Sequence, residues 1–85
     1  MSYGLVFTLR ATEVLAALPE VPHAMVTLAC FDIWQDPYGP CGLTTETSGL
    51  KTSRVWAVGS MGFIEYEVDD GAKLVTITNV ISADR

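Results

Sequence analysis

Residues 62–81 read Gly62-Phe-Ile-Glu-Tyr-Glu-Val-Asp-Asp-Gly71 and then Ala-Lys-Leu74-Val-Thr-Ile-Thr-Asn-Val-Ile81, and they carry the clearest strand pattern in the chain. Its two halves alternate with a period of two and are rich in branched and aromatic residues, which is typical of β-strands. Asp70-Gly71 between them is a strong tight-turn pair, because glycine takes positive φ without steric cost. The stretch therefore predicts two adjacent antiparallel strands, over 62–68 and 74–81.

The alternation also predicts which side chains share a face of the sheet, because successive strand residues point to opposite faces. In the first strand two sets oppose each other: Phe63, Glu65 and Glu67 against Ile64, Tyr66 and Val68. In the second strand the opposing sets are Val75, Ile77, Asn79 and Ile81 against Leu74, Thr76, Thr78 and Val80. We expect one face of each strand to be buried under helices and the other to be mixed, with glutamates alongside threonines.

Upstream of this stretch, Arg54-Val-Trp-Ala-Val58 predicts a third strand of the meander, which Gly59-Ser60 ends. Residues 37–52 are rich in glycine, proline and hydroxyl residues. We expect them to form a loop of about sixteen residues, which is long for a compact domain and therefore either functional or mobile.

The first third of the chain predicts one strand and two helices. Residues 3–9 alternate as a strand does, and Thr12 is placed to cap a helix near 12–18, which Pro19 ends. A second helix is expected near 22–35, because apolar residues repeat there at three- and four-residue spacing. The predicted order is β-α-α-β-β-β. The fold class is thus α+β, with a two-helix hairpin on one face of an antiparallel sheet and a single domain over 1–85.

Composition limits the function classes. The chain is 49% hydrophobic and 18% charged, with a net charge of −5. Nucleic-acid-binding proteins normally carry a basic stripe, but here the five cations are scattered. They are Arg10, Lys51, Arg54, Lys73 and Arg85. Direct binding of nucleic acid is therefore disfavoured. So few charged residues on so small a chain also suggest an apolar surface for a protein partner.

Other signals are weak. Cys30 is expected as a buried helix residue and Cys41 as a loop thiol. No apolar run approaches the roughly 20 residues of a membrane span, and no signal peptide opens the chain, so we expect a cytoplasmic protein without a membrane anchor. The acids between Glu65 and Asp70 lie along a strand and turn, so we read them as a solvated edge and expect neither a metal site nor a cofactor.

The predicted order and several local segments resemble the RelE/ParE toxins of bacterial toxin–antitoxin pairs. The likeness covers nearly the whole chain and includes the predicted first strand, helix exits and meander. The segments are Phe7-Thr-Leu-Arg-Ala11, Leu15-Ala-Ala-Leu-Pro19, Asp36-Pro-Tyr-Gly-Pro40, Arg54-Val-Trp-Ala-Val-Gly59 and Tyr66-Glu-Val-Asp-Asp70.

The resemblance implies basic and acid–base side chains on the concave face of the sheet in the members that cut mRNA. Arg54 and Lys51 match basic positions of the family, Arg85 is a displaced candidate, and Glu46 could serve as a base. The family's arginine before the middle strand is missing, since Gly62 or Phe63 stands there. Cleavage needs a base, an acid and cations together, and the chain offers few of these.

We therefore expect a toxin-like component of a toxin–antitoxin pair that acts mainly through protein binding, without the nuclease residues. One alternative is a non-enzymatic interaction module or homo-oligomer with the same fold; a second is a ribosome-dependent mRNA endoribonuclease. The expected partner is an antitoxin-like protein or a second copy. Trp34, Phe31 and Met25 on the second helix are the candidate partner-binding residues, whereas Trp56 is expected in the core.

Overall fold

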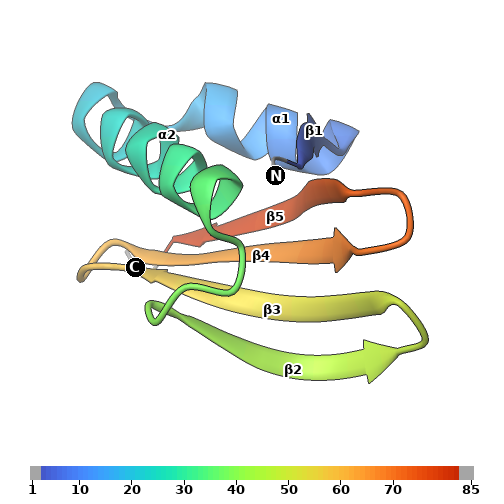
Figure 1. Ribbon diagram of the computed structural model, residues 1–85. Coiled ribbons are helices and arrows are strands. Elements are labelled where there is room, and N and C mark those ends of the chain that lie inside the picture. The colour runs from blue at the N-terminus through green and yellow to red at the C-terminus, as the bar shows by residue number, and fades with distance from the viewer. Residues whose placement is uncertain (1–2, 83–85) are drawn as a thin grey trace.

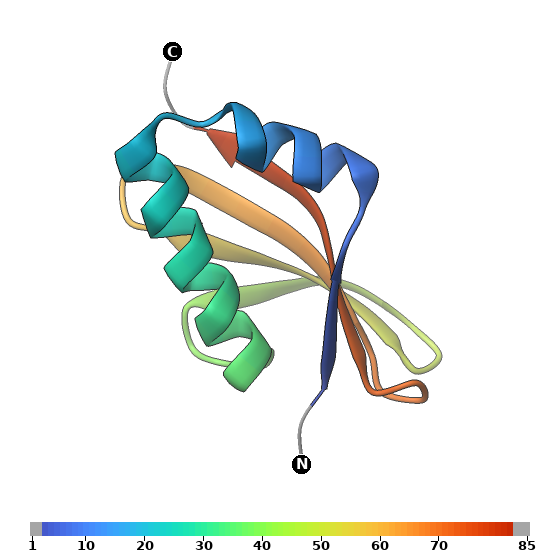
Figure 2. The same ribbon diagram turned by 90° about the horizontal axis from the view of Figure 1, so that it is seen from above.

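The computed structural model describes residues 3–82, which form two helices and a five-stranded sheet (Figure 1). In chain order the elements are β1 (Gly4–Phe7), α1 (Leu9–Ala17), α2 (Glu20–Gln35), β2 (Gly42–Ser48), β3 (Lys51–Val58), β4 (Gly62–Asp69) and β5 (Leu74–Ser82). The strand order is β1-β5-β4-β3-β2; β1 runs parallel to β5 and the other pairs are antiparallel. Both helices lie over one face of the sheet, and the other face is bare (Figures 1 and 2). The predicted α+β fold is confirmed.

The first helix begins earlier than predicted. Thr8, not Thr12, is the N-cap of α1, and its Oγ1 accepts a hydrogen bond from the N–H of Ala11 at 3.1 Å. Thr12 lies inside the helix, where its hydroxyl donates to the carbonyl of Thr8. The α2 helix follows after Leu18 and Pro19 and ends at Gln35, as predicted. Figure 2 shows that the two helices diverge from this connection and cross the sheet in different directions.

The expectation of a loop over 37–52 is wrong, because most of it forms a hairpin strand. β2 spans Gly42–Ser48 and pairs with β3, which begins at Lys51 rather than at residue 54. Gly49, with φ of 63°, makes the tight turn between the two strands. Threonine-rich sequence suits an exposed edge strand. Such a strand buries neither face and therefore shows no apolar alternation.

The alternation predicted for β5 holds as far as Ile77 and then shifts by one residue. Tyr66 pairs with Ile77 while Glu65 pairs with Asn79, so Thr78 is an extra residue in the ladder. Its Oγ1 donates to the carbonyl of Glu65 at 3.1 Å. Such a bulge sends the following residues to the opposite faces. Val80 is consequently buried, which corrects its predicted place on the mixed face.

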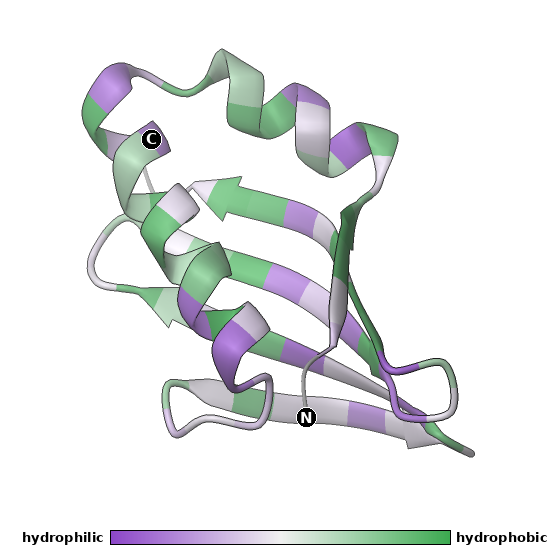
Figure 3. Cartoon of the chain, turned by 45° about the horizontal axis from the view of Figure 1, so that its top comes forward, coloured by the Kyte–Doolittle hydropathy of each residue, from purple (hydrophilic) through white to green (hydrophobic). Residues whose placement is uncertain are grey.

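The core lies between the helices and the sheet. Figure 3 shows hydrophobic and hydrophilic residues alternating along much of β4; its buried residues Ile64, Tyr66 and Val68 face the helices, whereas Phe63 is exposed. Cys30 is buried in α2 and Trp56 is buried on β3, both as predicted. Cys41 lies in the connection between α2 and β2, as predicted, and is exposed. The α2 helix is apolar on more than one side, since Val21, Leu28 and Phe31 stay exposed. Within residues 3–82 no helix is long and apolar enough to cross a membrane.

Candidate functional site

Arg54, the strongest candidate from the sequence, lies on the helix-covered face of the sheet with only 7% of its surface exposed. Its guanidinium donates three hydrogen bonds to neighbouring segments. Nε donates to Tyr66 Oη at 3.0 Å, Nη1 to Thr44 Oγ1 at 3.1 Å and Nη2 to the carbonyl of Gly39 at 3.1 Å. None of these three acceptors is a carboxylate. Arg54 therefore ties β2, β4 and the α2–β2 connection to β3.

Tyr66 extends this network to the end of α2. Its Oη donates to the carbonyl of Pro37 at 2.7 Å, and burial raises the pKa of its hydroxyl, although Arg54 opposes the rise. Because Gly42 has no side chain, Arg54 and Tyr66 can pack closely against the backbone of β2 at this position. A Cβ there would lie 2.7 Å from Arg54 Nη2 and 2.8 Å from Tyr66 Oη. The ring of Tyr38 covers the guanidinium, whose carbon lies 5.4 Å from the ring centroid.

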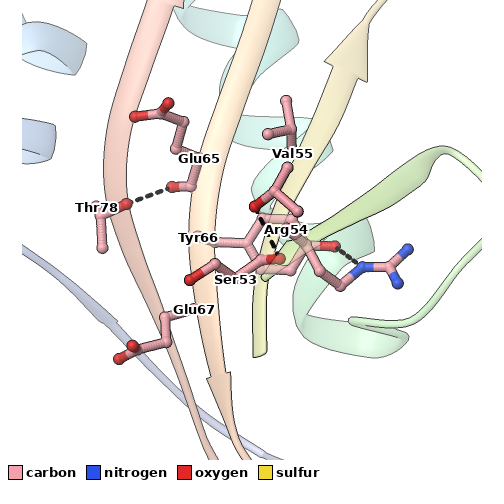
Figure 4. Close-up of a pocket in the computed structure, with 8 residues that line it drawn as sticks. Ser53, Arg54, Val55, Glu65, Tyr66, Glu67 and Thr78 are labelled. Carbon is pink, nitrogen blue, oxygen red and sulfur yellow. Dashed lines mark hydrogen bonds between the residues drawn. The ribbon is translucent and has the colours of Figure 1, made fainter. Parts of the chain in front are cut away.

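The opposite, bare face of the sheet carries carboxylates. Residues opposite each other in an antiparallel ladder share a face. Glu46 on β2 and Glu67 on β4 both pair with Ser53 of β3, and Glu65 pairs with Val55 in the next row. Glu65 and Glu67 border a hollow of about 270 Å³ on this face, and its lining also includes Arg54 and Tyr66. In Figure 4 the guanidinium of Arg54 points away from both glutamates. The bare face is thus acidic where it is hollowed.

The candidate catalytic residues are not brought together. Lys51 is exposed and lies two residues from Ser53, so it shares the bare face, in register with Asp69. Glu46 is exposed on β2, the edge strand. Arg54 lies on the other side of the sheet, and Arg85 lies outside the described residues. The sheet therefore separates Arg54 from Lys51 and Glu46. Within residues 3–82 no group of histidine, cysteine and acidic side chains is arranged to hold a metal ion.

A second polar cluster, centred on Asp70, was not predicted. Its carboxylate accepts hydrogen bonds from Tyr3 Oη at 2.6 Å and Tyr38 Oη at 2.7 Å. The tyrosine hydroxyls, that of Tyr3 first, hold the pKa of Asp70 below its usual value. In return, the bond to Asp70 raises the pKa of Tyr3 to about 12. Lys73 Nζ lies 5.4 Å from the centroid of the Tyr3 ring. Asp70 thus joins the start of β1, the α2–β2 connection and the β4–β5 turn.

The candidate partner-binding residues lie at different places on α2. Phe31 is 53% exposed and, with Leu28 and Phe7, borders an apolar hollow of about 300 Å³ between α2, α1 and β1. Trp34 is half-buried; its Nε1 donates to the carbonyl of Tyr3, and its ring makes an edge contact with Phe31. Met25 borders a separate hollow near Pro19. Of the three candidates, Phe31 is the one that borders the apolar hollow, and it is also the most exposed.

The architecture has counterparts among solved structures. A chain of the archaeal RelE–RelB complex from Pyrococcus horikoshii superposes with a TM-score of 0.84 at 17% identity, over 100% of this chain and 99% of that one. This is the RelE fold. The toxin–antitoxin complex RelBE2 from Mycobacterium tuberculosis gives a TM-score of 0.79 at 24% identity, covering 96% and 99% of the two chains.

The isolated RelE toxin from Escherichia coli shares the same architecture, with a TM-score of 0.76, 18% identity and coverage of 99% and 87%. No family model matches the chain, and no curated protein matches it. The resemblance to RelE that the sequence suggested is thus confirmed at the level of the fold. On this RelE fold, the bare sheet face carries Glu65 and Glu67, and Arg54 is held on the opposite side.

Proposed function

We propose that this chain is the toxin-like component of a toxin–antitoxin pair and acts by binding proteins rather than by cutting RNA. The RelE fold supports the first part. Two of the similar structures are the RelE–RelB complex and the toxin–antitoxin complex RelBE2, in which a RelE protein is bound to its antitoxin.

The distribution of charge across the sheet supports the second part and carries the proposal. RNA cleavage requires cations around the developing negative charge on phosphorus, together with a general base and a general acid. The hollow on the bare face presents Glu65 and Glu67 instead, and these carboxylates repel a phosphate backbone. The guanidinium of Arg54 is occupied by three protein acceptors.

The apolar hollow between α2, α1 and β1 supports an antitoxin-like partner. Leu28 is 67% exposed and Phe31 53%, although large apolar side chains on a helix are normally turned toward the core. A protein partner that covered them would remove apolar surface from water, and each such side chain would contribute roughly 1–2 kcal/mol to binding. A second copy of the chain is the alternative occupant of this surface.

Expression of the chain alone from a tightly repressed promoter tests the proposal. We expect arrested growth, relief by co-expression of an antitoxin-like partner, and no codon-linked cuts in translated messages by primer extension. A chain that leaves growth unchanged at verified soluble expression would contradict the toxin assignment. Codon-linked cuts that disappear in Lys51→Ala or Glu46→Gln, both folded, would show that the bare face is a nuclease site after all.

A further inference from the structure

The outer edge of β2 is open. β2 is the last strand of the order β1-β5-β4-β3-β2, and within residues 3–82 only β3 pairs with it. The carbonyl of Cys41 accepts a hydrogen bond from the N–H of Ala57, and Leu43 pairs with Val55 two residues further on. Because bonding alternates along an antiparallel ladder, Cys41 and Leu43 direct their backbone groups toward β3, and Thr44, the residue after Leu43, directs its N–H and C=O away from β3. These groups are available to another extended chain.

This edge lacks most of the features that normally block strand addition. Edge strands are usually short or carry lysine or proline. β2 is seven residues long and contains neither lysine nor proline, and its Leu43 side chain is 72% exposed. Its protective features are an irregularity at Thr45 and the charge of Glu46. The opposite edge strand, β1, has four residues. If a strand is added to this sheet, β2 is the edge that offers the longer ladder.

The negative charges beside β2 indicate which kind of segment would pair with this edge. Glu46 lies on the bare face of β2, in the same row as Glu67. Cross-strand neighbours of opposite charge stabilise a sheet, and like charges destabilise it. A second copy of β2 would contribute only another Glu46 from a chain of net charge −5. A basic segment would instead place Lys or Arg beside Glu46.

From these observations we infer that β2 accepts an extended segment of a protein partner that carries Lys or Arg at alternate positions. The backbone of the segment would continue the sheet, and its basic side chains would project over the acidic bare face. The inference rests on the proposed protein-binding function and specifies the chemistry of the partner.

Fluorescence anisotropy with a labelled Lys-Val-Lys-Val-Lys-Val-Lys-Val peptide tests the inference on the full chain. We expect saturable binding that weakens as salt rises. The same peptide with Glu in place of Lys should bind at least about tenfold more weakly, since it replaces several attractive pairs by repulsive ones. A peptide N-methylated at alternate residues keeps its charge but lacks the donors that a ladder requires, and it should lose binding.

Two variants give matched tests on the protein side. Glu46→Gln should weaken binding about threefold, as expected for an exposed ion pair, whereas Glu13→Gln on α1 should leave it unchanged. Thr47→Pro removes a backbone N–H on an edge strand, where proline is tolerated. This variant should lose peptide binding, while its circular dichroism spectrum stays the same as that of the parent. Thr47 is chosen because it is exposed and lies next to Ser48, which pairs with Lys51 at the hairpin turn.

Several results would overturn the inference. Equal binding of the N-methylated peptide would exclude strand addition, and equal binding of the Glu peptide would exclude charge selection. No binding at millimolar peptide would refute both. A dimer in sedimentation that Thr47→Pro converts to monomer would assign the edge to a second copy. The growth assay on the parent chain decides the toxin assignment independently, so failure of one proposal is distinguishable from failure of the other.

Discussion

Replacement of Arg54 by alanine tests the structural role that its contacts indicate. The side chain is buried and donates to Tyr66, Thr44 and the carbonyl of Gly39. Thr44 is exposed and can bond to water, so two acceptors lose a buried partner in the variant. Each hydrogen bond to a charged group contributes about 1.5–3 kcal/mol. We therefore expect a loss of about 3 kcal/mol, against a total stability of roughly 4–13 kcal/mol for a chain of this size.

Thermal unfolding followed by circular dichroism measures this loss. For a domain of this size, 1 kcal/mol corresponds to about 4–8 °C, so Arg54→Ala should lower Tm by roughly 12–24 °C. Arg54→Lys keeps the charge but lacks the planar fork, and it should lose about half as much. Lys51→Ala, at an exposed position of the same strand, is the control and should stay within about 0.5 kcal/mol of the parent.

The result that would refute this reasoning is an Arg54→Ala variant that unfolds within about 2 °C of the parent. Its hydrogen bonds would then contribute no net stability, and the residue would be free for another role. An Arg54→Lys variant as stable as the parent would show that charge alone matters at this position and that the three-way geometry does not.

Three further predictions follow from the clusters described above. Asp70→Asn should reduce the fall of Tm at acid pH. Because the pKa of Asp70 is lowered in the folded protein, the ionised carboxylate stabilises the fold at pH values above its unfolded pKa near 3.8, and this stabilisation is lost as the pH falls through the folded pKa. Gly42→Ala should cost roughly 1–3 kcal/mol in urea unfolding, because the new Cβ meets atoms held within 3 Å. Phe31→Ala should weaken binding of an antitoxin-like partner about tenfold in titration calorimetry, while its Tm stays near that of the parent. Trp34→Ala should also lower Tm, because its Nε1 donates to the carbonyl of Tyr3, which directly precedes β1.

The fold was predictable where the signal is local. Residues 62–68 and 74–81 alternate because one face of each strand is buried, and this leaves a period of two in the sequence. β2 could not be found this way, because a strand exposed on both faces has no such period. The shift at Thr78 was equally hidden, since it depends on the pairing with Glu65 on the neighbouring strand.

The candidate site was predictable only in part. The resemblance selected Arg54, and the alternation of Arg54, Trp56 and Val58 already placed these three residues on one face of β3. Because Trp56 was expected in the core, the same pattern could have indicated that the arginine points inward. The cluster at Asp70 carried no comparable signal. Its tyrosines come from positions 3 and 38, and only the folded chain brings them to one carboxylate.

The charges on the two sides of the sheet bear on both proposals. A polyanion on the bare face would need Glu65 and Glu67 neutralised, although Lys51 lies on the same face, and Arg54 could reach it only by giving up three hydrogen bonds. A basic protein segment meets neither cost, since its own cations pair with these glutamates. The open backbone of β2 adds directional donors and acceptors beside the same carboxylates. Two independent features, the acidic face and the open edge, therefore favour the same kind of ligand, an extended and positively charged protein segment.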